Sequence, residues 1–150
     1  MFTKNHNYSM IDLGKRLQEL MDENDINKIK DYFEFNSTAT IYDWINNKYL
    51  PNFTNMIKLA DYFHVNLDYL LGLSQNMEEI VSKNIPPFHE HFKKVIKNNK
   101  SSQYKLLKSK IISRGHLNSW FNTGSLPSVE NLVKIADFLK ISVDELVGRV

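Results

Sequence analysis

Residues 113–127 read Ser113-Arg114-Gly115-His116-Leu117-Asn118-Ser119-Trp120-Phe121-Asn122-Thr123-Gly124-Ser125-Leu126-Pro127. A serine that can cap a helix comes first, and a glycine and a proline that end one come last. Leu117, Trp120 and Phe121 have the i, i+3, i+4 spacing that places side chains on one face of a helix. The remaining faces carry small, polar and basic side chains, which suits insertion into a groove of DNA. An ordinary amphipathic surface helix has the same pattern, so the segment alone does not decide between the two.

The same plan occurs a second time in the chain. Residues 40–51 read Thr40-Ile41-Tyr42-Asp43-Trp44-Ile45-Asn46-Asn47-Lys48-Tyr49-Leu50-Pro51. An offset of 76 residues pairs identical residues along the two segments and beyond them: Trp44 with Trp120, Pro51 with Pro127, Ala60 with Ala136, Asp61 with Asp137, Asp68 with Asp144, Leu70 with Leu146 and Gly72 with Gly148. A match of this extent indicates two copies of one structural unit. We therefore expect two domains, at residues 9–73 and 88–150, joined by a linker at residues 74–87.

Each repeat predicts five short helices, because apolar residues recur at three- and four-residue spacing and no alternating run or hairpin turn is found. Capping residues are expected at the helix starts: Ser9, Ser37, Asn66, Ser101, Ser113, Ser128 and Ser142. Within the linker, residues 77–81 are expected to form one or two helical turns. Trp44 and Trp120 are expected in the core. Tyr49 and Phe53 are expected to form an apolar surface suited to a dimer contact.

Composition excludes several classes of protein. The chain of 150 residues has no cysteine, so disulfides, thiolate nucleophiles and cysteine-ligated zinc are excluded. No apolar run approaches the ~20 residues of a membrane span, and no signal-peptide core is found, so we expect a cytoplasmic protein without a membrane partner. The sequence His89-Glu90-His91 does not place its histidines on one helix face, so no metal site is expected. Without a phosphate-binding glycine loop or a nucleophile with its base, we expect neither an enzyme nor a cofactor.

Charge is distributed unevenly between the two repeats. The formal net charge is +2, but residues 1–75 carry seven Lys and Arg against ten Asp and Glu, whereas residues 76–150 carry twelve against seven. No acidic residue lies between His91 and Val129, and this interval holds a block of cations: Lys93, Lys94, Lys97, Lys100, Lys105, Lys108, Lys110 and Arg114. A solvated lysine face is common in proteins, but this block leads directly into the segment 113–127. The second repeat is therefore predicted to bind a polyanion.

The plan of five helices with a tight turn between the second and third resembles the Xre/Cro/phage-repressor family of helix-turn-helix proteins. The residues that carry the resemblance are Leu117-x-x-Trp120-x-Asn122, Leu126-Pro127-Ser128 and 132–146 in the second repeat, and Ile41-x-x-Trp44-x-Asn46, Leu50-Pro51 and 59–72 in the first. The resemblance implies an all-α chain of two lambda-repressor-like five-helix domains in tandem. Two departures are found. The first repeat needs an extra residue near 36–40 to fit the usual spacing, and the usual glycine after the third helix is Asn47 or, in the second repeat, Thr123 followed by Gly124.

The resemblance also implies roles for single residues. Helix three faces base edges with its first residues and with a residue near its middle, which gives Arg114, Gly115, His116 and Ser119 in the second repeat and Thr38, Ala39 and Asp43 in the first. The start of helix two and the end of helix three contact phosphates, which gives Gln103, Asn122, Asn27 and Asn46. Lys93, Lys94, Lys105, Lys108 and Lys110 are expected to add phosphate contacts. Arg114 is the foremost candidate, because a guanidinium reads guanine O6 and N7 together, at about 1–3 kcal/mol.

Two interpretations of the first repeat stay open, because its expected recognition helix has no cation before Lys48 and contains Asp43. In one, both repeats bind DNA as a pseudo-dimer on an asymmetric site. In the other, which the charge favours, the second repeat binds DNA and the first holds a partner protein. The leading hypothesis is a sequence-specific transcriptional repressor that binds double-stranded DNA and forms a homodimer. The alternative is a protein-interaction module on the same fold, such as an antitoxin or an inhibitor.

Overall fold

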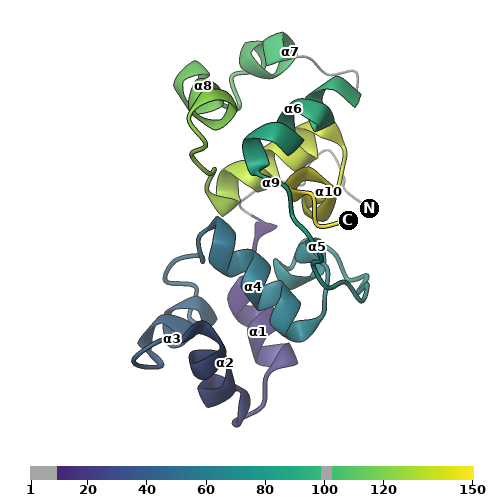
Figure 1. Cartoon of the computed structure of the whole chain (residues 1–150). Coiled ribbons are helices and arrows are strands. Elements are labelled where there is room, and N and C mark those ends of the chain that lie inside the picture. Colours follow the sequence, from purple (N-terminus) through teal and green to yellow (C-terminus); the bar gives the residue numbers. More distant parts are fainter. Residues whose placement is uncertain (1–9, 99–102) are drawn as a thin grey trace. The chain divides into compact units, whose positions relative to one another are not determined.

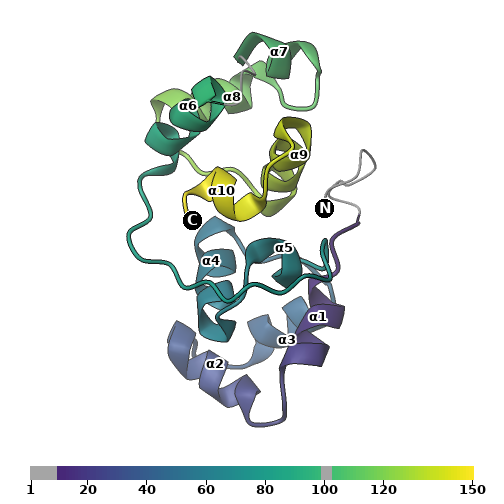
Figure 2. The same cartoon turned by 90° about the vertical axis from the view of Figure 1, so that its right-hand side faces the viewer.

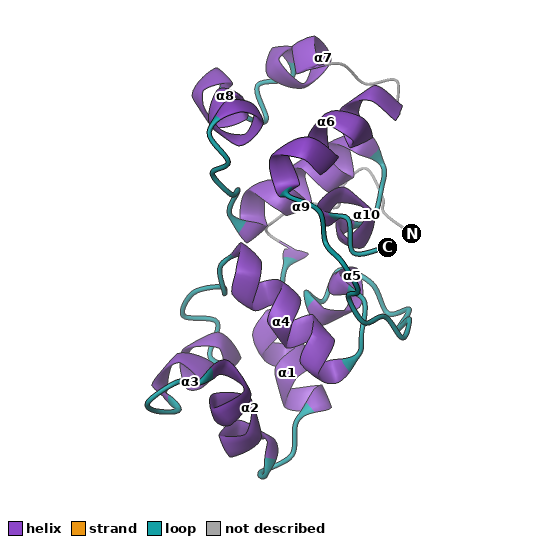
Figure 3. Ribbon diagram, in the orientation of Figure 1, coloured by secondary structure: helices purple, strands orange, loops and turns teal. Residues whose placement is uncertain are grey.

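The computed structural model describes residues 10–98 and 103–150. Within these residues it contains ten α-helices and no strand apart from one isolated antiparallel bridge between Val65 and Glu79 (Figures 1 and 3). The predicted all-α class is confirmed. Contacts divide the chain into two compact units, residues 10–81, called unit one, and residues 82–150, called unit two. Among the helices described, none has the length and apolar character needed to span a membrane.

Unit one contains α1 (Leu13–Leu20), α2 (Asp25–Phe33), α3 (Ala39–Ile45), α4 (Phe53–Phe63) and α5 (Leu67–Leu70). Helix α1 packs against α3 and α5, α2 packs against α3, and α4 packs against α5. Trp44 of α3 is only 1% exposed and lies edge-on to Phe33 of α2, with ring centroids 5.4 Å apart. The prediction that this tryptophan belongs to the core is confirmed.

Unit two repeats the plan with α6 (Phe88–Asn98), α7 (Gln103–Lys108), α8 (Arg114–Asn122), α9 (Val129–Leu139) and α10 (Val143–Val147). Helix α6 packs against both α8 and α10, and α9 packs against α10. Trp120 is 3% exposed, which confirms its predicted place in the core. Ser128 and Ser142 cap α9 and α10 as predicted, because their hydroxyls accept hydrogen bonds from the backbone N–H groups of Asn131 and Glu145.

Several predicted helix starts differ in the structure. Helix α1 begins at Leu13 with Asp12 as its cap, and the Asp12 carboxylate accepts from the Lys15 N–H at 3.1 Å. The predicted caps Ser9 and Ser101 lie outside the described residues. The Ser37 hydroxyl accepts from the Ala39 N–H at 3.3 Å, although Thr38 is the cap residue of α3.

Asn66 is the N-cap residue of α5 as predicted, but its side chain makes no capping hydrogen bond. Its Oδ1 instead accepts from the Glu78 N–H at 2.8 Å, and its Nδ2 donates to the Asn76 carbonyl at 3.3 Å. These bonds hold residues 76–78 against Asn66. The Ile80 N–H also donates to the His64 carbonyl at 3.2 Å. The helical turns expected at residues 77–81 are therefore wrong, because the backbone there bonds to residues 64–66 and not to itself.

Phe53 is buried, with 8% of its surface exposed, whereas Tyr49 is 47% exposed. The prediction that both form an apolar surface is wrong for Phe53. As the first residue of α4 it lies directly after the Asn52 cap and turns into the core. Phe53 has i, i+3, i+4 spacing to the buried Met56 and Ile57, so the helical period places it on the core face of α4.

Candidate nucleic-acid interface

Helix α8 is fixed in unit two by its buried apolar face and by the Ser113 cap at its start. The Ser113 hydroxyl accepts from the His116 N–H at 3.1 Å and so satisfies one of the free donors at the start of the helix. Leu117, Trp120 and Phe121 are buried. Phe121 stacks on Phe92 of α6, with centroids 5.0 Å apart and an interplanar angle of 10°. The two helices lie side by side in Figures 1 and 2, so the direction of α8 is set by its packing.

The remaining surface of α8 carries the residues predicted to face base edges. Arg114, Gly115 and His116 are exposed in its first turn, and Ser119 is half-buried. The His116 ring stacks flat on Trp120, with centroids 5.6 Å apart and an interplanar angle of 9°. The imidazole of His116 therefore packs on the Trp120 ring. Arg114 is the long exposed side chain at the N-terminal end of α8.

Gly115 is not required by the packing of unit two. A Cβ atom added at Gly115 would meet no other atom within 4 Å, and its backbone is helical. Glycine costs a helix roughly 0.5–1 kcal/mol relative to alanine. Gly14 of α1 shows the opposite case, because a Cβ there would collide with the Ile45 carbonyl oxygen. The open space at Gly115 therefore faces outward, where a partner molecule could approach the helix backbone closely.

Most of the predicted phosphate contacts precede α8 along the chain. Gln103 is the first residue of α7, and it is exposed together with Lys105, Lys108 and Lys110. Lys93 and Lys94 are exposed on α6, on the side away from Phe92, whose ring contacts α8. Lys105 and Lys108 are thus exposed on the helix that precedes α8, and Lys93 and Lys94 are exposed on the helix that packs against it.

The turn between the second and third helices has the same length in both units. Its left-handed residue is Glu34 in unit one, with φ 59°, and Lys110 in unit two, with φ 62°, which are related by the 76-residue offset. Helix α3 nevertheless begins one position later than α8, and Thr38 makes no side-chain capping bond where Ser113 does. The extra residue expected near 36–40 is therefore not found in unit one when it is compared with unit two, and the two units differ there in that helix three begins one position later.

The ends of the third helices confirm the sequence pattern. Asn47 adopts φ 54° and Gly124 adopts φ 74°, and each lies two residues after the last residue of its helix. Gly124 comes one position later than Asn47 at the 76-residue offset, because α8 also ends one position later than α3. Thr123 keeps φ −112° and donates from its hydroxyl to the Ser119 carbonyl at 2.7 Å.

The candidate residues of unit one are less favourable for DNA. Ala39, Asn27 and Asn46 are exposed, whereas Thr38 and Asp43 are half-buried. Three acids lie at the start of α2 and just before it, namely Asp22, Glu23 and Asp25, of which the first two are exposed. The sequence at the same offset in unit two, residues 98–101, reads Asn-Asn-Lys-Ser. Unit one would therefore present carboxylates where the resemblance expects phosphate contact.

Comparison with known families agrees with this geometry. A helix-turn-helix family model matches residues 36–70 and 92–146, together more than half of the chain. The chain belongs to the helix-turn-helix family of the Xre, Cro and lambda-repressor type. Searches of curated proteins and of solved structures returned no significant match. Members of this family are DNA-binding transcription regulators. The second helix of such a motif is named the recognition helix, and its counterparts in this chain are α3 and α8.

The two family matches are not equally complete. In unit two the match runs from α6 to α10, whereas in unit one it begins at Asn36 and leaves out α1 and α2. The portion left out includes the acidic approach to α2. Unit two therefore matches the family model over more of its length than unit one does.

Two exposed residues of the recognition helices were not among the predicted contacts. Asn118 is exposed on α8, one turn after Arg114, and Tyr42 occupies the equivalent place on α3 with 49% of its surface exposed. Their four-residue spacing from Arg114 and Thr38 is the signal that could have identified them.

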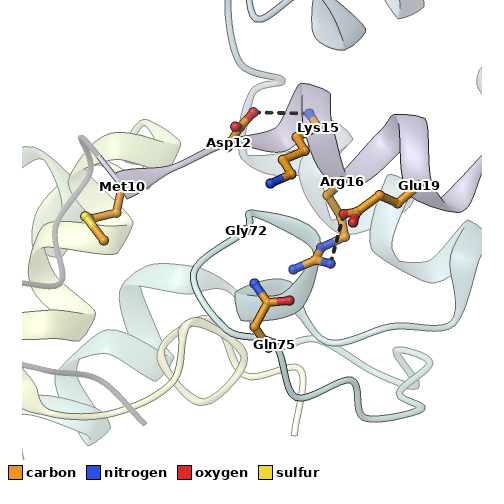
Figure 4. A pocket seen from close by; sticks show the side chains of 7 residues that line it. All are labelled: Met10, Asp12, Lys15, Arg16, Glu19, Gly72 and Gln75. Atoms are coloured by element: carbon orange, nitrogen blue, oxygen red, sulfur yellow. Dashed lines mark hydrogen bonds and ion pairs between the residues drawn. The ribbon is translucent and has the colours of Figure 1, made fainter.

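Other clusters in the described residues do not form a second site. No group of three or more His, Asp or Glu residues there is arranged to hold a metal ion. His91 Nε2 lies 2.7 Å from the Glu145 carbonyl oxygen, a contact that joins α6 to α10. A pocket of about 250 Å³ in unit one is lined by polar side chains, including Asp12, Lys15, Arg16 and Glu19 (Figure 4). The Arg16 guanidinium is already bonded to Glu19 and to the carbonyls of Tyr69 and Ser74.

Proposed function

We propose that this helix-turn-helix protein is a sequence-specific transcriptional repressor that acts in the cytoplasm by occupying an operator. The observation that carries the proposal is the exposed face of α8, where Arg114 and the open space at Gly115 follow a block of cations with no acidic residue. Lysines of α7 would bind phosphates and position the helix, and Arg114 would read a guanine.

A homodimer is part of this proposal. Two α8 helices, one from each chain, would enter major grooves one turn of DNA apart, at a spacing of about 34 Å. The operator would then be a palindrome. A pseudo-dimer of unit one and unit two would instead require an asymmetric operator, because α3 and α8 carry different exposed residues.

The second candidate function is protein binding through unit one. Exposed Tyr42, half-buried Asp43 and the acids before α2 favour it, because carboxylates are repelled by phosphates. On this hypothesis unit one holds a second copy of the chain or another protein, as an antitoxin or inhibitor would. The operator would then be read by unit two alone.

The experiment is selection of binding sites from randomised double-stranded DNA by the full-length chain, followed by affinity measurements at two salt concentrations. We expect a palindromic motif that contains a guanine, and an affinity that falls steeply with salt, because each phosphate contact adds about 0.9 to the slope of log K against log salt. Arg114→Ala should lose the preference for that guanine, with a cost of roughly tenfold or more in affinity.

Lys83→Ala is the matched control, since it removes one exposed positive charge of unit two outside α7 and α8. It should leave the motif unchanged. A long asymmetric motif would show that α3 also reads DNA. Absence of binding to any DNA at ~50 mM salt, where electrostatic affinity is strongest, would contradict the proposal.

A further inference from the structure

Asn118 is an exposed amide on the recognition helix of unit two, and its side chain makes no hydrogen bond within the described part of the chain. Unit two therefore loses no contact of its own if this amide binds another molecule. At an exposed position in the middle of a helix, asparagine stabilises the helix less than alanine or another good helix former does. The fold by itself gives no reason for an amide at this position.

Asn118 belongs to a continuous polar stripe. Arg114, Asn118 and Asn122 follow one another at four-residue spacing, and all three are exposed. Residues at this spacing lie one above the other on a helix, and their side chains lean toward the helix N-terminus. The amide of Asn118 thus lies over the turn that carries Arg114, at the end of α8 that is proposed to enter the groove.

Gly115 makes the short side chain of Asn118 useful. Gly115 lies three residues before Asn118, so the two are neighbours on the helix surface. The space beyond the Gly115 Cα is empty within 4 Å. An asparagine has one methylene group before its amide and reaches a base edge only if the helix backbone comes near it. The missing side chain at Gly115 permits that approach.

We propose that Asn118 is a second base-reading residue of α8 and that it selects an adenine. Its Oδ1 would accept from the adenine N6 amino group, and its Nδ2 would donate to adenine N7, a pairing that no other base offers in the major groove. The inference rests on the proposed function and extends it, because the operator half-site must then contain an adenine close to the guanine read by Arg114. Tyr42, the counterpart in unit one, cannot make this pair, so the adenine belongs to half-sites read by unit two.

The test is the same DNA selection, carried out with full-length Asn118→Ala and compared with wild type. We expect the preference for adenine to disappear at one position of each half-site, with a loss of roughly tenfold or more on the wild-type site and little loss on sites changed at that position. The thermal unfolding midpoint should not fall and should rise slightly, because Asn118 has no partner to lose and alanine is the better helix former.

Asn122→Ala is the contrasting variant on the same stripe. As a proposed phosphate contact it should weaken binding to all sequences about equally and keep the motif. A wild-type motif without an adenine, or an adenine preference that survives in Asn118→Ala, overturns the inference while leaving the proposed function standing. A wild-type chain that binds no DNA at all removes both.

Discussion

At the scale of single residues, the two helical glycines near the recognition helices have opposite reasons to be there. Gly14 is required by the protein itself, because the Ile45 carbonyl and the Asn47 amide occupy the place of a side chain. Gly115 has no such neighbour and weakens the helix in which it lies. A residue that costs stability without serving the fold is typical of a functional surface.

Gly115→Ala should therefore stabilise unit two and weaken DNA binding. We expect a gain of about 0.5 kcal/mol in the free energy of unfolding, the low end for glycine because residue 115 lies in the first helical turn. The added methyl group would hold α8 away from the groove and lower the affinity for the selected site. Chemical denaturation and a binding titration on the same samples measure both effects. Unchanged DNA affinity would show that the open space is not used by DNA.

At the scale of elements, α1 and α3 are joined by the side chain of Asn47. Its Oδ1 accepts from the buried Gly14 N–H at 2.9 Å, and its Nδ2 donates to Asp12 Oδ1 at 3.0 Å. The bond from Asn47 and the bond from the Lys15 N–H lower the pKa of the Asp12 carboxyl from its ordinary value. One amide thus closes the end of α3 and orders the cap of α1.

Asn47→Ala should destabilise unit one by about 2 kcal/mol, because it leaves the Gly14 N–H unsatisfied and places alanine at a positive φ. It should also reduce the acid sensitivity of unit one. A lowered folded pKa means that the contribution of Asp12 is complete above the ordinary aspartate pKa and is lost as the pH falls through the folded value. Chemical denaturation at several pH values measures the free energy of unfolding and its dependence on pH. The exposed neighbour variant Asn46→Ala should change neither, and an unaltered pH dependence in Asn47→Ala would refute this role.

At the scale of the whole molecule, each unit fastens its own end of the connecting segment. In unit one, Asn66 holds residues 76–78. In unit two, the fully buried Arg149 side chain donates to Asp144 Oδ1 at 2.8 Å and to the Ser82 hydroxyl at 3.1 Å. Residues 74–87, expected as a linker, are therefore divided between the two units by their contacts.

Asp144→Asn should unfold unit two early and leave unit one unchanged. The Arg149 guanidinium would remain buried without its carboxylate, and the loss of one partner from such a pair costs about 3–5 kcal/mol. Calorimetry of the full-length chain should show two transitions, of which only one moves. Asp68→Asn, at the equivalent position of unit one where the aspartate is half-exposed, should shift the other transition less. A single transition that shifts as a whole would show that the two units unfold together.

The internal repeat allowed much of this protein to be predicted. The 76-residue offset, the helical spacing around Trp44 and Trp120, and the turn residues Asn47 and Gly124 indicated the all-α fold, the helix-turn-helix family and the placement of α8. These features depend on short-range spacing, which a sequence displays directly. The base-facing roles of Arg114 and Gly115 were implied instead by the resemblance to the Xre/Cro/phage-repressor family.

Only the tertiary structure could decide features that depend on distant neighbours. Asn66 occupies the predicted N-cap position of α5, but its side chain bonds to Asn76 and Glu78, which return to it from further along the chain. Gly14 and Gly115 are both helical glycines, yet a side chain at Gly14 would collide with the Ile45 carbonyl, whereas one at Gly115 would enter open space. A residue's type and spacing determine which helix it joins, whereas the atoms that surround it come from other elements and are known only once the chain has folded.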